Sequence, residues 1–308
     1  MVYYSNALKK ILCIMISGVC LVSCSRTDLP KDNSLITVGI GAMPTELDPQ
    51  LAIDSSSIRV IDDLFEGLVS FDQSNETIPG LAKSWSVSSD DKVYTFHLRD
   101  GLKFSDGSPI TADDIVFSWR RLVDPKTNSD YRYALNDVVN APQIIAGKLS
   151  PEMLGIKALD EHTLEVSLIS SNNAFLSICA QPALDVLSRA NVTTYGNKWT
   201  LAVNMVTSGA YKLKAIEPGR DVVELGKNLN YYDAKFTAID NVKMLALANS
   251  SDTIKLYDEN KLDVSWNISI IQLATVKNRT DLYSTVREGI YYYDFNMNNP
   301  EIRAIVNT

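Results

Sequence analysis

Apolar and polar residues alternate along this chain with two different spacings, which predict strands in some segments and helices in others. Residues 35–40 and 93–99 alternate with a period of two, which is typical of strands that bury one face. From Ser57 onward the apolar residues recur at helical spacing. A further helix is predicted to begin at Thr111, because two aspartates follow in its first turn, where negative charge is favourable.

Turn-forming residues divide other apolar stretches into hairpins. Residues 155–168 are predicted to turn near Asp160, and residues 211–225 are predicted to turn at a Pro-Gly pair. Further strands are predicted at residues 242–247, 262–266 and 289–296. The order of these elements predicts a mixed α/β fold with many hairpins and not a regular series of βαβ units.

The N-terminal end has the pattern of a secretion signal. Lys9 and Lys10 precede the apolar run 11–22, which is too short to span a bilayer, since about 20 apolar residues are needed. The run ends in Leu-Val-Ser-Cys at residues 21–24, which resembles the lipobox at which a cysteine is acylated. We therefore predict lipidation of Cys24; the alternative is an ordinary signal peptide with an incidental cysteine.

On this interpretation residues 1–23 are removed and residues 24–34 tether the folded part to a membrane. Removal takes away two lysines, so 27 basic side chains face 37 acidic ones and the net charge becomes about −10. Such an acidic body argues against nucleic acid or an anionic membrane surface as an electrostatic partner. Cys179 would be the one cysteine without lipid, and its apolar neighbours predict a buried, unreactive thiol and no intramolecular disulfide.

The sequence contains no combination of residues that indicates an enzyme. His97 and His162 are the only histidines, and neither has a second ligand at a spacing suited to a metal ion. The Gly-x-Ser-x-Gly motif of serine hydrolases and glycine-rich phosphate loops are absent. We therefore predict no enzyme activity, no metal site and no cofactor.

Several sequence blocks are individually modest signals but are specific when taken together. The densest is FSDGSPITADDIVFSW at residues 104–119. Others lie at residues 46–49, 63–68, 79–85, 94–99, 160–166 and 208–211. In content and order they resemble the bacterial extracellular solute-binding proteins of family 5, the peptide-binding subunits of ABC importers. Residues 123–127 and 196–199 are most similar to the oligopeptide-binding branch, although dipeptide, nickel and haem-related binders share the other blocks.

The resemblance implies a periplasmic-binding-protein-like two-lobe fold of type II, cluster C, with an extra small domain. The implied division is lobe I at residues 35–65 and 191–288, a small accessory α/β domain at residues 66–190, and the hinge with the start of a missing lobe at residues 289–308. The resemblance breaks off near residue 300, where relatives enter their second lobe. We therefore expect the second lobe to be missing, and the product to be a truncated or split-gene fragment with reduced activity.

The family binds extended peptides between two lobes, mainly through backbone hydrogen bonds. The resemblance places Asp54 and Ser55 in the segment that cradles the peptide, Tyr131 in the accessory domain, Asn267 near the hinge and Tyr292 in an aromatic cluster. Each position has an alternative explanation. Ser55 could cap the helix that follows, and Tyr131 could simply cover the core. In the aromatic cluster Tyr292 faces opposite to the tyrosines on either side of it, and only one face of a strand can meet a cleft, so Tyr292 is the predicted ligand contact.

The implied partners are short peptides and inner-membrane ABC permease subunits. The chain would act as a monomer held by Cys24 on a membrane, in the periplasm or at the cell surface. Because recognition through backbone hydrogen bonds depends little on the peptide's side chains, we expect the protein to accept peptides of varied sequence. The alternatives are an interaction or signalling lipoprotein that kept the fold without transport, and an extracytoplasmic hydrolase, for which no catalytic residues are found.

Overall fold

The computed structural model describes residues 34–266, residues 268–283 and Asn298. The predicted signal and residues 24–33 of the predicted tether, with Cys24, lie outside the described residues. So do the predicted site residues Asn267 and Tyr292 and the predicted strand at residues 289–296. In the part that is described, no helix is long and apolar enough to cross a membrane.

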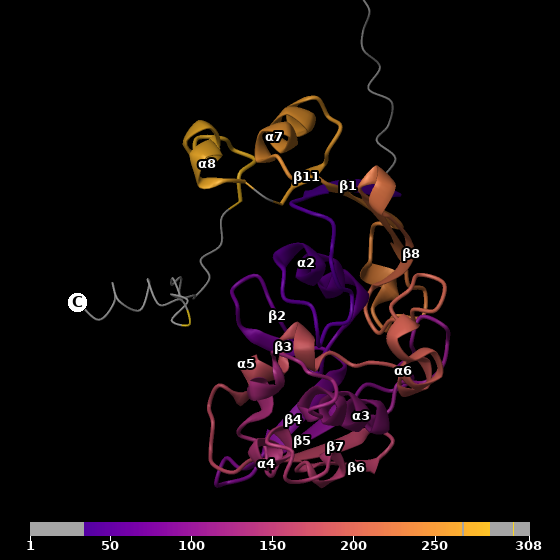
Figure 1. Ribbon diagram of the computed structural model, residues 1–308, viewed down its shortest axis with the longest axis vertical. Helices are drawn as coiled ribbons and strands as arrows, with labels where there is room; N and C mark the ends of the chain where they lie inside the picture. The colour runs from indigo at the N-terminus through magenta and orange to yellow at the C-terminus, as the bar shows by residue number, and fades with distance from the viewer. Residues whose placement is uncertain (1–33, 267, 284–297, 299–308) are drawn as a thin grey trace, which may run out of the picture.

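A five-stranded sheet forms the upper part of the molecule in Figure 1. Its strands, in spatial order, are β11 (Val264–Ser265), β1 (Leu35–Ile40), β10 (Asn241–Ala246), β9 (Val222–Lys227) and β8 (Tyr211–Glu217). β1 runs parallel to β10 and β11, whereas β8, β9 and β10 are antiparallel neighbours. The predicted hairpin of residues 211–225 is therefore confirmed as β8–β9. The predicted strand at residues 35–40 is confirmed as β1.

Helix α2 (Ser55–Leu64) packs its apolar stripe against this sheet and closes one hydrophobic core. Val60, Ile61 and Leu64 are fully buried on that stripe. Asp54 caps the helix, since its carboxylate accepts the backbone N–H of Ser57. The helix thus begins two residues before the apolar spacing alone indicated, because the cap and not the first apolar residue sets its start.

A four-stranded sheet lies in the lower part of Figure 1. Its strands, in order, are β4 (Ala82–Val87), β5 (Val93–Leu98), β7 (Thr163–Ser167) and β6 (Ile156–Asp160). Alternate residues of β5 are buried, as the period of two predicted. Helix α3 (Ala112–Val123) packs next to β6 and begins after Thr111, whose N–H and hydroxyl both donate to the Asp114 carboxylate. Both the strand and this helix start are confirmed.

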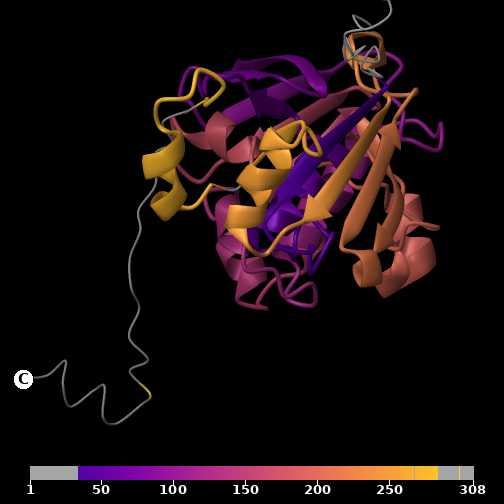
Figure 2. The same cartoon turned by 90° about the horizontal axis from the view of Figure 1, so that it is seen from above.

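Shorter elements connect the two sheets and cover their edges. They are β2 (Val69–Phe71), β3 (Thr77–Pro79), η1 (Arg132–Leu135), α4 (Ala141–Ile145), η2 (Pro151–Met153), α5 (Phe175–Cys179), η3 (Pro182–Leu184), α6 (Arg189–Tyr195), η4 (Gly196–Lys198), η5 (Pro218–Arg220), η6 (Ala234–Phe236), α7 (Ser250–Asp258) and α8 (Ile270–Val276). Viewed from above, α7 lies in front of the β1 end of the five-stranded sheet (Figure 2). A Cβ on Gly39 would meet side chains of Leu262 and Thr253, so α7 and the loop after it sit tightly on β1.

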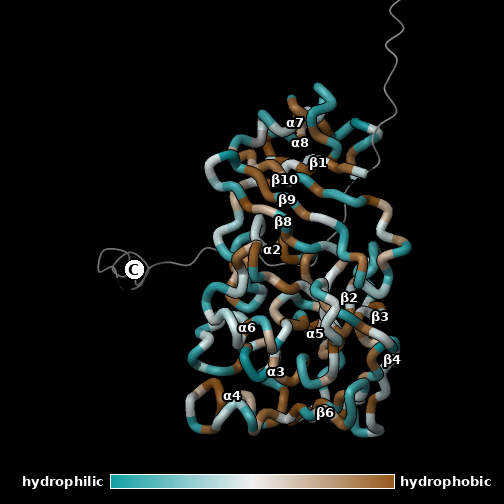
Figure 3. Tube along the Cα trace, turned by 90° about the vertical axis from the view of Figure 1, so that its right-hand side faces the viewer, coloured by the Kyte–Doolittle hydropathy of each residue, from teal (hydrophilic) through white to brown (hydrophobic). Residues whose placement is uncertain are grey.

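The buried apolar residues of the described chain form two separate clusters. One cluster consists of residues between Leu68 and Val186, a range that includes the four-stranded sheet. The other consists of residues from β1 to Phe65, with α2, and of residues from Leu187 onward, which include the rest of the five-stranded sheet. Figure 3 shows hydrophobic segments in both parts of the molecule. The change of core near Phe65 and Val186 supports the predicted accessory domain, whose boundaries stay a prediction. Cys179 is fully buried, and burial raises the pKa of its thiol well above the usual value.

Candidate functional site

The segment immediately before α2 presents open backbone to solvent. Ala52 is fully buried, whereas the side chain of Ile53 is 68% exposed, so the chain emerges from the core between them. Asp54 is extended, with φ −95° and ψ 150°. Among the described residues, none accepts a hydrogen bond from the backbone N–H groups of Ile53, Asp54 or Ser55. An extended segment with unpaired N–H groups can receive another extended chain as an added strand.

The two predicted residues of this segment contribute in different ways. The Asp54 carboxylate accepts the N–H and hydroxyl of Ser57 at 2.9 Å and 2.6 Å, and the hydroxyl of Thr45 at 2.7 Å. Partial burial raises the pKa of Asp54, but these hydrogen bonds outweigh it and lower the pKa overall. The carboxylate is thus committed to capping. Ser55 is exposed and is the first residue of α2, so the expectation that it could be the cap is wrong.

Tyr131, which the resemblance placed in the accessory domain, directly precedes the short helix η1. Its ring is half-buried and packs against the core of residues 68–186, so it does cover that core, as the alternative explanation held. Burial raises the pKa of its phenol, and Tyr133, Asp130 and Asp54 raise it further. The Asp54 carboxylate is thus close enough to the Tyr131 phenol to raise its pKa, although helix α2 and the Tyr131 ring pack into different cores.

Trp266 is an exposed aromatic residue that the sequence analysis did not select. It directly precedes the predicted Asn267, is 51% exposed, and lies under the Arg59 guanidinium, 5.1 Å from ring centroid to Cζ. Arg59 lies on α2 and also pairs with Asp63 at 3.1 Å. A tryptophan that ends a predicted strand next to a candidate residue was the sequence signal that could have identified it.

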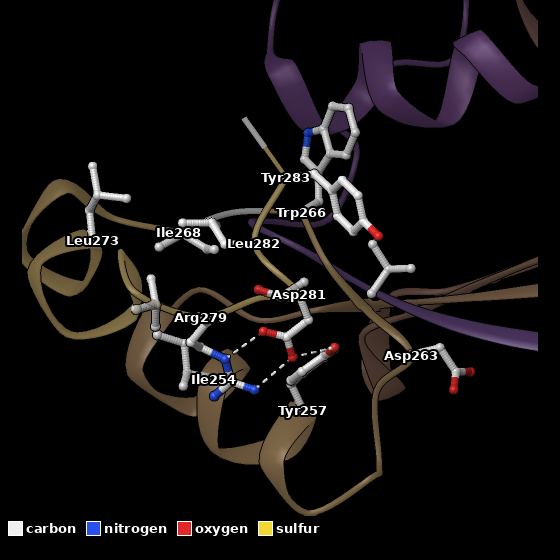
Figure 4. Close-up of a pocket in the computed structure, with 13 residues that line it drawn as sticks. Ile254, Tyr257, Asp263, Trp266, Ile268, Leu273, Arg279, Asp281, Leu282 and Tyr283 are labelled. Atoms are coloured by element: carbon white, nitrogen blue, oxygen red, sulfur yellow. Dashed lines mark hydrogen bonds and ion pairs between the residues drawn. The ribbon is translucent and has the colours of Figure 1, made fainter. Parts of the chain in front are cut away.

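A cavity of about 730 Å³ opens beside Trp266 (Figure 4). Its wall is mainly apolar and comes from β11, α7, α8 and the residues after α8; the side chains that define it in Figure 4 include Ile254, Trp266, Leu273 and Tyr283. On its floor Arg279 forms a two-point ion pair with Asp281, with both N–O distances 2.9 Å. Asp54, Ser55 and Tyr131 are not among the residues that line this cavity.

The described side chains contain no cluster that suits a metal ion. Within residues 34–266 and 268–283, no group of three histidine, cysteine, aspartate or glutamate side chains comes close enough together to hold one. The two histidines lie on a strand and in a hairpin turn of the four-stranded sheet, with exposed or partly exposed side chains.

Comparisons with known proteins match most of the chain. The family model described as bacterial extracellular solute-binding proteins, family 5 Middle, matches residues 76–305. The periplasmic murein peptide-binding protein MppA of Escherichia coli is 38% identical over 257 residues, which is 82% of this chain and 47% of MppA. The periplasmic oligopeptide-binding protein OppA of Salmonella typhimurium is 35% identical over 306 residues, which is 95% of this chain and 56% of OppA.

Solved structures show the same relationship. OppA of Burkholderia pseudomallei superposes with a TM-score of 0.76 at 31% identity, over 80% of this chain and 49% of that one. The Haemophilus influenzae OppA complex with the peptide RPPGFSPFR also gives 0.76, at 35% identity, over 80% of this chain and 48% of that one. The predicted mixed α/β, periplasmic-binding-protein-like fold is confirmed. The chain spans about half the length of the curated relatives it matches.

Proposed function

Because this chain belongs to the bacterial extracellular solute-binding proteins of family 5, we propose that it binds short peptides outside the cytoplasm for uptake by an ABC importer. The peptide lies extended along residues 53–55, with Tyr131 on the accessory side and Trp266 on the side of α2. The main chain supplies most of the affinity, so the preference among peptide side chains is loose.

One observation carries this proposal: the backbone N–H groups of Ile53, Asp54 and Ser55 have no acceptor within the described chain, and Asp54 in the middle is extended. A buried, unpaired backbone donor is costly, and an exposed one is bonded only to water that a ligand carbonyl can replace. The exposed side chain of Ile53 adds apolar surface at the same place. Free amino acids offer too few carbonyl groups to use this segment, so they should compete poorly.

Replacing Ser55 by proline tests the role of the backbone directly. Ser55 is the first residue of α2, where proline is well tolerated, and Asp54 already has the extended conformation that a following proline requires. Ser55→Pro therefore deletes one N–H and leaves the helix in place. We expect it to weaken trialanine binding by about tenfold, the equivalent of ~1.4 kcal/mol.

Two control variants separate the N–H from other effects. Ser55→Ala removes the hydroxyl but keeps the N–H, and should bind trialanine nearly as the parent does. Ile270→Pro makes the same backbone change at the first residue of α8, an exposed position away from residues 53–55. If Ser55→Pro and Ser55→Ala bind equally well by calorimetry, backbone recognition at this segment is ruled out.

The peptide affinity of the parent chain tests whether these 308 residues are sufficient for binding. A Kd near ~1 µM would show that these 308 residues suffice for binding, whereas ~1 mM, more than ~4 kcal/mol weaker, would show that contacts from the rest of the relatives' length are required. Deoxycholate is a useful comparison ligand, because one relative is named a probable deoxycholate-binding periplasmic protein and the cavity beside Trp266 is mainly apolar. Tight deoxycholate binding without peptide binding would replace the proposed ligand class.

The extracytoplasmic location and the lipid anchor are further parts of this proposal. Relatives of this chain are named periplasmic proteins, and the signal followed by Leu-Val-Ser-Cys supports acylation of Cys24. The chain then works as a tethered monomer that meets inner-membrane permease subunits, without enzyme activity. Cys24→Ala should abolish metabolic labelling by a radioactive fatty acid, and undiminished labelling would remove the anchor from the proposal.

A further inference from the structure

The loop that leads into residues 53–55 is buried and polar, and it is held by the accessory domain. Asp48 and Gln50 are 2% and 0% exposed. Arg121, on α3, donates to both carboxylate oxygens of Asp48 and to the side-chain oxygen of Gln50, with its Nη1 3.2 Å from the first of them. The Gln50 amide in turn donates to the Ser118 carbonyl of α3 at 2.7 Å. At Asp48 and Gln50, five and three residues before Ile53, the chain is thus anchored on a helix of the other core.

A single buried hydroxyl continues this connection to Tyr131. Ser129 is fully buried, and its hydroxyl donates to the backbone carbonyl of Gln50, 79 positions away in the sequence. The same oxygen accepts the backbone N–H of Tyr131 at 3.0 Å. Gln50 lies three residues before Ile53, and Tyr131 lies two residues after Ser129. One oxygen atom therefore joins the backbone leading to the open segment with the backbone that carries the tyrosine ring.

We propose that Ser129 is a positioning residue for ligand binding, whose hydroxyl sets the Tyr131 ring against the open backbone of residues 53–55. The proposal rests on the proposed peptide binding, which needs the two features at a fixed separation. A side chain without a hydroxyl cannot bridge an acceptor and a donor, so no apolar residue can replace serine here. The hydroxyl itself is buried and does not contact the ligand, so Ser129 acts only through its neighbours.

Hydrogen exchange tests the connection without any ligand. In the full chain, Ser129→Ala should speed amide exchange in two segments that are far apart in sequence, residues 48–54 and residues 129–134. Ser208→Ala is the matched control. Ser208 is 1% exposed, and its hydroxyl also accepts a distant backbone N–H, that of Glu66 at 3.1 Å, but neither residue contacts Tyr131 or Gln50 in the described contacts. Ser208→Ala should destabilise the chain without selectively speeding exchange in the two segments.

Calorimetry with trialanine tests the consequence for binding. We expect Ser129→Ala to weaken binding about tenfold, as the loss of one well-placed hydrogen bond does, while Ser208→Ala leaves the affinity within a factor of about two. In a Tyr131→Ala background the same serine change should cost almost nothing further, because the ring it positions is gone. If the double variant loses affinity by the product of the two single fold-losses, the two residues act independently and the proposal is overturned. Unchanged amide exchange in residues 48–54 of Ser129→Ala would overturn it as well.

The two proposals fail in different ways. A parent chain that binds no trialanine refutes peptide binding and with it the positioning role, and the exchange data still decide whether Ser129 couples the two segments. A parent chain that binds, with Ser129→Ala binding equally well, leaves peptide binding intact and refutes the positioning role alone.

Discussion

The indole of Trp119 lies wholly inside the core of the four-stranded sheet, and its ring nitrogen is bonded there. Trp119 is fully buried, meets Phe175 edge to face at 6.3 Å, and donates Nε1–H to the Leu184 carbonyl at 3.1 Å. Trp119→Phe removes that donor and leaves a buried carbonyl unsatisfied, at a cost of about 1–3 kcal/mol. The smaller ring also leaves a gap of roughly 40 Å³, which at ~24 cal/mol per Å³ adds about 1 kcal/mol.

Trp199 is the matched position in the other core. It is 2% exposed and meets Phe65 edge to face at 5.9 Å, and within the described residues its ring nitrogen has no such hydrogen bond. Trp199→Phe should therefore cost only the gap, about 1 kcal/mol. The predicted free energies of unfolding fall by about 2–4 kcal/mol for Trp119→Phe and by about 1 kcal/mol for Trp199→Phe.

Urea unfolding followed by far-ultraviolet circular dichroism measures both costs on one scale. If the two cores unfold separately, each variant should move a different transition, which also tests the predicted accessory domain. Equal losses of stability in the two variants would refute the reasoning, because the hydrogen bond to Leu184 would then contribute nothing. A larger loss for Trp199→Phe would show that packing in its core is tighter than its contacts indicate.

Three further predictions concern single buried groups. Burial, and then the charges of Asp62 and Glu66, raise the pKa of the Asp185 carboxyl well above its usual value. The folded state therefore binds this proton more tightly than the unfolded state, and the free energy of unfolding falls as pH rises above about 4. Asp185→Asn should raise the urea midpoint at pH 7 but not at pH 3.5, and equal gains at both pH values would contradict this. A Cβ on Gly209 would lie 2.7 Å from a backbone carbon of α2, so Gly209→Ala should lower stability by about 1–3 kcal/mol, checked by thermal unfolding. The Cys179 thiol should react with a chromogenic disulfide reagent only in denaturant, and rapid reaction of the folded chain would show that it is accessible.

The family and the local elements could be predicted from the sequence, whereas much of the candidate site could not. The resemblance identified the peptide-binding family and led to Tyr131 and the segment containing Asp54. It did not predict that the Asp54 carboxylate would be used as a helix cap, because capping depends on where the helix begins and on Thr45, nine positions earlier. Trp266 was missed for a similar reason, since its neighbour Arg59 is distant in sequence.

Strand β5 and the start of α3 were determined by neighbouring residues. The period of two in residues 93–98 decides which side chains face the core, and the contact between Thr111 and Asp114 spans a single helical turn. These signals depend only on residues a few positions apart, so they can be predicted without knowledge of the rest of the fold. For the same reason the hairpins and the Thr111 cap of α3 were predictable from the sequence.

Only the tertiary structure decided how these elements meet. β1 pairs in parallel with β10, about 200 positions further along the chain, and no local pattern specifies that partner. Arg121 lies on a helix stripe that could equally face solvent, yet it is held by Asp48, 73 positions earlier. Charge pairs and strand partners of this kind follow from packing, in which a buried group must find its complement wherever the fold brings one within reach. The sequence determined which pieces form, and packing determined which of them share a site.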